Sequence, residues 1–181
     1  AIYLIRQDNL AESDPGQFIP GTTTTASRAI KGAKTRGLDL EVNGAINRQW
    51  SIAASYNFSA SEDATGQRIN TTFPRQMARL WTTYRMPGEW RRLTVGGGVN
   101  WSSGIEYSGE AWQVGKQVSA RQASYAVAGL MARYDVSDQL SLTLNVNNLF
   151  DRKYIAAMSG WWYSGMYGAP RNVQVLSLIH I

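Results

Sequence analysis

The sequence predicts an all-β protein, an antiparallel transmembrane β-barrel segment of about eight strands. Three observations predict this fold class: short segments alternate between apolar and polar residues, their connections alternate between short and long, and aromatic residues lie near the segment ends. Of 181 residues, 44% are hydrophobic and 11% aromatic but only 17% are charged, and the mean hydropathy is −0.30. Such an average results when every strand divides its side chains between lipid and a polar lumen.

The first four expected strands lie in the N-terminal half. Residues 1–7 correspond to the end of a strand, and in residues 35–46 leucine and valine alternate with Asp, Glu and Asn. In residues 49–60, apolar and aromatic residues occupy every second position and Ser, Ala and Asn lie between them. Residues 78–86 alternate in the same way, with two Arg on the second face. A helix would scatter these residues around its axis, whereas a strand separates them onto two faces.

The last four expected strands follow the same rule. In residues 93–101, Leu, Val and Trp alternate with Thr, Gly and Asn, and the glycine run 96–98 permits a bend or a close approach of another chain segment. Residues 124–136 place Ala, Leu and Tyr on one face, and residues 140–147 place three Leu and a Val opposite Ser, Thr and Asn. The final strand is expected from residue 169 to the end.

The connections and the aromatic residues indicate a membrane setting. Short turns alternate with long connections in outer-membrane barrels, and aromatic rings mark both edges of the lipid-facing band. The short turns are expected at 47–49, 87–89 and 137–138, and the long connections at 8–34, 61–75, 103–123 and 151–168. The aromatics near strand ends are Trp50, Trp90 and Tyr134 by the short turns, with Phe58 and Trp101 toward the long connections.

Other classes of protein fit the composition less well. A soluble sandwich or lipocalin-like barrel also alternates, but its outer face would carry many Lys and Glu, and here the polar face is mostly Ser, Thr, Asn and Gly. The net charge of +5 is scattered rather than clustered, so we expect no nucleic-acid partner. The chain has no Cys, which rules out disulfides and thiolate metal sites within it.

Catalytic and metal-binding residues are not expected. The only histidine, His180, lies in an atypical tail, so a Ser-His-Asp arrangement finds no support. The carboxylates Glu62, Asp63, Glu106 and Glu110 lie in expected connections and are interpreted as solvated. No cluster of His, Cys, Asp or Glu has the spacing of metal ligands, and no phosphate-binding glycine motif occurs.

Three runs of residues carry a family resemblance. The first is Asn147-Asn148-Leu149-Phe150-Asp151-Arg152-Lys153-Tyr154. It resembles the penultimate-strand motif of TonB-dependent receptors, Asn-Leu-Phe-Asp-Lys/Arg-x-Tyr. The second, Arg36-Gly37-Leu38-Asp39-Leu40-Glu41, is similar to a recurrent strand of the same family, and the third, Gly168-Ala169-Pro170-Arg171-Asn172-Val173, resembles the entry to its final strand. The likeness is greatest to ferric-coprogen and ferripyoverdine receptors.

The resemblance implies a Gram-negative outer-membrane receptor that takes up ferric siderophores. Its barrel would have about 22 strands with a plugged lumen, and this chain would be the C-terminal part, without the plug and the TonB box. The implied partners are a ferric siderophore, outer-membrane lipid and lipopolysaccharide, and the TonB complex through the missing N-terminal region. Iron would arrive already chelated, so no cofactor is expected. The alternative is a small stand-alone outer-membrane barrel that acts as a pore or structural anchor.

Aromatic residues in the long connections are the candidate ligand contacts. Water-facing loops have no solubility reason to hold many aromatics, and aromatic walls can grip the organic shell of a chelate. A cationic side chain could pair with an anionic chelate. The candidates are Trp161, Trp162, Tyr163, Trp112, Tyr107 and Arg121.

The two ends of the chain are also unusual. The chain begins Ala-Ile-Tyr without Met or a signal peptide, which predicts a fragment. Residues 1–175 are expected to form the barrel portion. The tail at 176–181 breaks the alternation and ends without an aromatic residue, so we expect it to be foreign to the barrel, an artefact of cloning or assembly.

Overall fold

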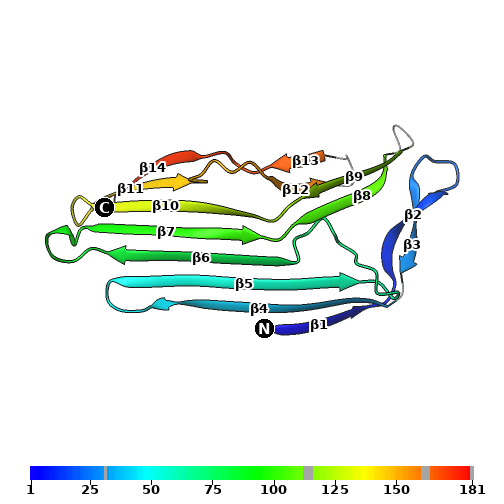
Figure 1. The fold of residues 1–181 in the computed structure, drawn as a ribbon, viewed down its shortest axis with the longest axis horizontal. Helices are drawn as coiled ribbons and strands as arrows, with labels where there is room; N and C mark the ends of the chain where they lie inside the picture. Colours follow the sequence, from blue (N-terminus) through cyan, green and yellow to red (C-terminus); the bar gives the residue numbers. More distant parts are fainter. Residues whose placement is uncertain (31, 112–115, 160–163, 180–181) are drawn as a thin grey trace.

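The computed structural model describes all residues except 31, 112–115, 160–163 and 180–181. Eight antiparallel strands lie side by side in one sheet in the order β1-β4-β5-β6-β7-β10-β11-β14 (Figure 1). Each corresponds to one of the eight expected strands, with ends that differ by a few residues. The strands are β1 (Ile2–Gln7), β4 (Ala33–Ala45), β5 (Trp50–Glu62), β6 (Gln76–Arg85), β7 (Leu93–Ser102), β10 (Tyr125–Asp135), β11 (Leu140–Asn147) and β14 (Asn172–Ile179).

The register gives the sheet one apolar face and one polar face, because directly paired residues share a face. One row across five strands contains Leu40, Tyr56, Ala78, Trp101 and Ala126. The neighbouring row, on the opposite face, contains Asp39, Asn57, Met77, Ser102 and Tyr125. The expected sorting of side chains is therefore confirmed across the sheet.

The sheet has almost no apolar core. Among the described residues, only the apolar side chains of Ala33, Ala60 and Ile105 are buried, whereas Leu80, Val99 and most other large apolar residues of the apolar face are exposed. A soluble sandwich would bury that face, so the sandwich alternative is wrong. None of the helical segments in the described parts of the chain has the length and apolar character needed to cross a bilayer.

The apolar face has the height of a lipid-facing band. Trp50 and Phe58 lie near opposite ends of β5 on that face. Eight residue steps between them correspond to about 27 Å along the strand, or about 20 Å along the membrane normal at a tilt of about 40°. The short-turn edge carries exposed Trp50, Trp90 and Tyr134, and the Trp50 indole Nε1 donates to Thr82 Oγ1 at 2.6 Å.

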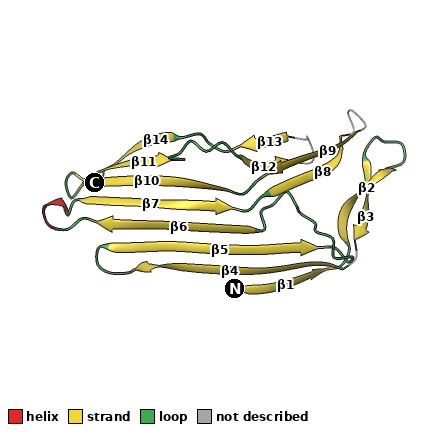
Figure 2. Ribbon diagram, viewed as in Figure 1, coloured by secondary structure: helices red, strands yellow, loops and turns green. Residues whose placement is uncertain are grey.

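Three of the four long connections form hairpins that the sequence did not predict (Figure 2). They pair β2 (Leu10–Phe18) with β3 (Thr25–Ile30), β8 (Ile105–Ala111) with β9 (Lys116–Gln122), and β12 (Ile155–Ser159) with β13 (Ser164–Tyr167). Their backbones are held by ladder hydrogen bonds while their side chains show little alternation, so a search for period two overlooks them. All three lie at one end of the sheet, the hairpin end, and the short turns lie at the other, the short-turn end (Figure 1).

Strand β14 continues into the atypical tail. Thr143 pairs with Leu176 and Ser141 with Leu178, and the ladder reaches Ile179. The register therefore places Leu176 and Leu178 on the polar face, and both are exposed. That the tail is foreign to the barrel stays a prediction.

Candidate functional site

The β8–β9 hairpin carries the two expected ligand contacts that the structure describes. Tyr107 pairs with Ala120, and in the adjacent row Glu106 pairs with Arg121. Adjacent positions of a strand point to opposite faces. Tyr107 and Arg121 therefore lie in neighbouring rows of the hairpin, on its opposite faces. Half-buried Tyr107 lies over Gly109, where an added Cβ would be 2.3 Å from the phenolic oxygen.

A basic hollow of about 330 Å³ lies beneath this hairpin. Its lining includes Phe58, Arg68, Arg75, Glu106 and Arg121. The Arg75 guanidinium lies over the Phe58 ring, 5.7 Å from its centroid, and Arg68 Nη1 lies 3.8 Å from Glu106 Oε1. Arg68 Nη2 and Arg75 Nε are enclosed without a hydrogen-bond partner. The hollow therefore holds three cations against one carboxylate.

The motif after β11 builds a tight turn around one buried side chain. Asn148 is only 4% exposed and has a left-handed backbone, φ 50°. Its Nδ2 donates to the carbonyls of Arg152 at 2.9 Å and Ala169 at 3.0 Å, and its Oδ1 accepts the Arg152 N–H at 2.8 Å. Asparagine suits both tasks, because it tolerates the left-handed region and its amide can donate and accept.

Other motif residues fix the segment that leads into β14. Asp151 has φ 51°, and its Oδ1 accepts the Arg171 N–H at 3.0 Å. Asn147 Nδ2 donates to Asn172 Oδ1 at 3.0 Å, and the Leu149 N–H donates to the Ala128 carbonyl at 2.9 Å. This region of the motif thus ties β11 to β14, the last two strands of the sheet. Phe150, in contrast, is 78% exposed.

Tyr154 completes the motif by packing against β10. Its ring stacks on Tyr125 with centroids 4.2 Å apart. It also covers Gly168, where an added Cβ would be 2.0 Å from Tyr154 Cζ. Next to it, the Ile155 N–H donates to Gln122 Oε1 at 2.9 Å. The motif therefore positions β12 against the end of β9.

The second segment that resembles the family, residues 36–41, is also held by specific side-chain contacts. An added Cβ on Gly37 would be 2.0 Å from Tyr3 Cζ, so glycine is needed where that ring crosses β4. Asn57 Nδ2 donates to the Asp39 carboxylate on the polar face. On the apolar face, Arg36 Nη2 lies 2.9 Å from Glu62 Oε1.

Four expected ligand contacts cannot be placed. Trp112, Trp161, Trp162 and Tyr163 lie outside the described residues. Their contact with a ligand stays a prediction, as does that of Tyr107 and Arg121. The sequence did not single out Arg68 or Arg75, because their proximity depends on how the 61–75 connection folds against β8.

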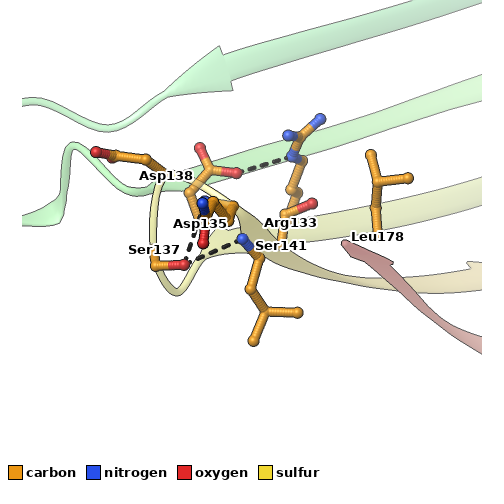
Figure 3. Close-up of a pocket in the computed structure, with 8 residues that line it drawn as sticks. Arg133, Asp135, Ser137, Asp138, Ser141 and Leu178 are labelled. Atoms are coloured by element: carbon orange, nitrogen blue, oxygen red, sulfur yellow. Dashed lines mark hydrogen bonds and ion pairs between the residues drawn. The ribbon is translucent and has the colours of Figure 1, made fainter. Parts of the chain in front are cut away.

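A second hollow, of about 310 Å³, lies at the short-turn end (Figure 3). Ser137 Oγ accepts the N–H groups of Gln139 at 3.2 Å and Leu140 at 3.1 Å, which closes the turn. Beside it, Arg133 Nε lies 3.0 Å from an Asp135 carboxylate oxygen. The hollow lies beside a tight turn, at the opposite end of the sheet from Tyr107 and Arg121 (Figure 1).

Acidic residues of the described segments do not gather into a metal site: no group of three or more His, Cys, Asp or Glu is placed to hold an ion. Asp63 instead stabilises its own turn. Its Oδ1 accepts the Thr65 hydroxyl at 2.7 Å, the Thr65 N–H at 2.8 Å and the Gln67 N–H at 2.9 Å. These bonds, the Thr65 hydroxyl above all, hold the pKa of the Asp63 carboxyl below its usual value.

Comparison with known proteins agrees with this architecture. Residues 1–149 match the family described as TonB dependent receptor-like, beta-barrel. The chain is 43% identical over 176 residues to the ferric-pyoverdine 358 receptor of Pseudomonas putida, which covers 97% of this chain and 21% of that receptor. It is 34% identical to the ferripyoverdine receptor of Pseudomonas aeruginosa, which covers 96% of this chain and 21% of that receptor.

Solved structures show the same likeness. The crystal structure of the Pseudomonas aeruginosa ferripyoverdine receptor bound to ferripyoverdine superposes with a TM-score of 0.84 at 32% identity, over 97% of this chain and 23% of that one. The alcaligin outer-membrane receptor of Bordetella pertussis gives a TM-score of 0.63 at 43% identity, over 98% of this chain and 24% of that one. The chain thus spans about a fifth of the length of the curated relatives it matches.

Proposed function

The chain belongs to the TonB-dependent receptor-like β-barrel family of the Gram-negative outer membrane, and on that premise we propose that it is part of a receptor for ferric siderophore uptake. The expected family membership and fold class are confirmed. The proposal extends them to the activity of a longer protein, in which this segment would supply the last third or so of a barrel of about 22 strands.

The proposal rests on the known proteins that the chain resembles. Three receptors that are 43%, 40% and 34% identical across nearly the whole chain are all receptors for ferric pyoverdines. Receptors for ferrichrome and ferrioxamine match at 29% and 28%. We therefore propose a ferric siderophore of the pyoverdine class as the ligand. Iron would enter as part of this chelate, and transport would draw energy from TonB.

The structure suggests how the hairpin end would take part in ligand binding. The β8–β9 hairpin lies at the hairpin end of the sheet (Figure 1), and its described residues would border the mouth of a closed barrel. Tyr107 offers an aromatic surface and Arg121 a guanidinium that could pair with an anionic chelate. Because the two side chains lie on opposite faces of the hairpin, a ligand over the mouth would contact one of them directly.

Uptake of radiolabelled iron by the complete receptor tests the proposal. We would express it in cells that lack their own siderophore receptors and supply ferric pyoverdine, ferrichrome or ferrioxamine. Uptake of ferric pyoverdine that requires TonB is the expected result. A receptor that takes up none of the three chelates, or takes one up equally well without TonB, would contradict the proposal and favour a passive pore.

Substitutions at Tyr107 and Arg121 then test which of the two side chains contacts the ligand. Tyr107→Ala and Arg121→Gln are compared with Tyr134→Ala and Arg91→Gln, which make the same chemical changes near the short-turn end. We expect one variant of the hairpin to weaken ferric-pyoverdine binding about tenfold, as loss of a central contact does, and both controls to bind normally. Unchanged binding in both hairpin variants would remove Tyr107 and Arg121 from the site.

A further inference from the structure

The polar face of the sheet carries a tryptophan and an arginine halfway along the strands. Trp81 and Arg79 lie two positions apart on β6, and their partners on β5 are Ala53 and Ser55. Both partners lie in the middle of the segment 50–58, which spans the apolar band on the opposite face. In a closed barrel the polar face lines the lumen. Both side chains would therefore lie inside the barrel, at the depth of the lipid tails.

Glycines form a floor beneath the Trp81 ring. Trp81 pairs with Gly98 on β7, which in turn pairs with Gly129 on β10. A Cβ added to Gly98 would be 2.5 Å from Trp81 Cε3, and one added to Gly129 would be 3.7 Å from Trp81 Cζ3. The ring therefore lies across β7 toward β10, against the backbone. Trp81 is still 37% exposed, so an aromatic surface stays open on the polar side.

Arg79 is an exposed cation on the same face. It forms neither an ion pair nor a side-chain hydrogen bond with the described residues. Its neighbours in the row, Ser55 and Asn100, are uncharged. Glu41 pairs with Ser55 and so lies two strands away from Arg79, about 10 Å. A charged side chain at the depth of the lipid tails faces a polar interior at a cost in stability, and such residues often mark the path of a substrate.

We propose that Arg79 and Trp81 form a second contact for the ferric chelate, on the lumen wall below the mouth. This rests on the proposed function, in which a ferric chelate crosses the barrel. The Trp81 ring offers a flat surface to the organic shell of the chelate. The Arg79 guanidinium can pair with a carboxylate of an anionic chelate through two hydrogen bonds. The two positions are about 7 Å apart along the strand, so one chelate can span both.

This second contact would act in passage through the barrel and not in capture at the mouth. From Ser55, the partner of Arg79, β5 continues to Glu62 at the hairpin end, about 23 Å along the strand. A chelate held by the β8–β9 hairpin would therefore reach Arg79 only after it leaves the mouth. A site inside a channel speeds passage when it binds the ligand well enough to admit it and weakly enough to release it.

Separate measurements of capture and passage test the proposal in the complete receptor. The variant is Arg79→Gln/Trp81→Ala. The matched control, Arg91→Gln/Trp90→Ala, removes the same two kinds of exposed side chain at the short-turn end. At equal amounts of receptor in the outer membrane, ferric pyoverdine should bind equally to both in cells without TonB. TonB-dependent uptake at saturating chelate should be about tenfold slower in the variant, the effect expected from losing an aromatic contact and a charge-assisted hydrogen bond.

A charge series tests the role of Arg79 itself. Arg79→Lys keeps the positive charge and should retain most of the uptake rate, whereas Arg79→Glu should slow uptake at least as much as Arg79→Gln, because it repels an anionic chelate. Capture at the mouth should be the same in all three. Uptake that is equally slow in the lysine and glutamate variants would contradict a contact with an anionic ligand.

Vancomycin, which is too large to cross an intact outer membrane, distinguishes a chelate contact from a contact with the plug. In cells without TonB, the Arg79→Gln/Trp81→Ala variant should exclude it as well as the unaltered receptor does. Entry of vancomycin through the variant would overturn the proposal and assign the pair to holding the plug. Equal uptake by variant and control, or capture that weakens in parallel with uptake, would also overturn it. An unaltered receptor that takes up no ferric pyoverdine would contradict the proposed function as well, whereas normal uptake by receptor and variant alike would contradict this inference alone.

Discussion

Replacing Asn148 should loosen the connection between β11 and β14. The buried Asn148 amide makes three hydrogen bonds, two to carbonyls and one from the Arg152 N–H. At about 1 kcal/mol each, their loss destabilises the turn by about 3 kcal/mol. An alanine at φ 50° adds about 1 kcal/mol, because a left-handed backbone disfavours Cβ.

Two further variants separate these contributions. Asn148→Gly removes the amide but tolerates the left-handed backbone, so it should destabilise the turn by about 3 kcal/mol, against about 4 kcal/mol for Asn148→Ala. Asn70→Ala is the matched control. Asn70 has φ 58° and is exposed, and it shows no side-chain hydrogen bond to the described residues, so its loss should cost about 1 kcal/mol.

Hydrogen exchange in the complete receptor measures the effect. The amide of Arg152 is protected by Asn148 Oδ1, and a change of about 3 kcal/mol corresponds to roughly a hundredfold loss of protection. The peptide that contains Arg152 should therefore exchange about a hundred times faster in Asn148→Gly. Equal exchange in Asn148→Gly and the unaltered receptor would refute the assignment of a turn-locking role to Asn148.

Two other perturbations have defined outcomes. Gly168→Ala places a Cβ 2.0 Å from Tyr154 Cζ and should lower the free energy of unfolding, measured in urea, by about 1–3 kcal/mol. In a Tyr154→Ala background the same substitution should be nearly neutral. A loss of stability that persists without the ring would contradict the steric explanation. The pKa of Asp63 is lowered mainly by the Thr65 hydroxyl, so its turn is fully stabilised above the unfolded value of about 4 and loses stability as pH falls through the folded value. Cleavage of this turn by an acid protease should therefore accelerate on acidification, and Asp63→Asn should abolish that pH dependence; an identical profile in the variant would contradict it.

The eight strands of the sheet could be predicted because its apolar face is built for lipid and its polar face for water. The apolar residues from Trp50 to Phe58 alternate with small polar ones, and this pattern fixes the register of β5 and its neighbours. The same contrast disappears in the loops, which are surrounded by water on both sides. The hairpin of Tyr107 and Arg121 was therefore expected only as an irregular connection, although the expected residues lie on it.

The site could be predicted only in part, because its contacts depend on tertiary folding. The motif around Asn148 was visible in the sequence, but its hydrogen bonds to Arg152 and Ala169 were not. The approach of Arg68 to Glu106 depends on how the 61–75 connection folds, where the Glu106 N–H donates to the Thr71 carbonyl at 3.0 Å. No local pattern encodes a contact of that kind.

The chain contains no Cys, so single introduced cysteines can report directly on membrane sidedness. Ser108→Cys lies on the exposed β8–β9 hairpin, and Asp138→Cys lies in an exposed short turn at the opposite end. In intact cells that express the complete receptor, with the unaltered receptor as the background control, a maleimide that cannot cross the outer membrane should label Ser108→Cys and should label Asp138→Cys only after permeabilisation. Equal labelling of both positions in intact cells, or labelling of Asp138→Cys alone, would contradict an outer-membrane barrel whose hairpins face the outside.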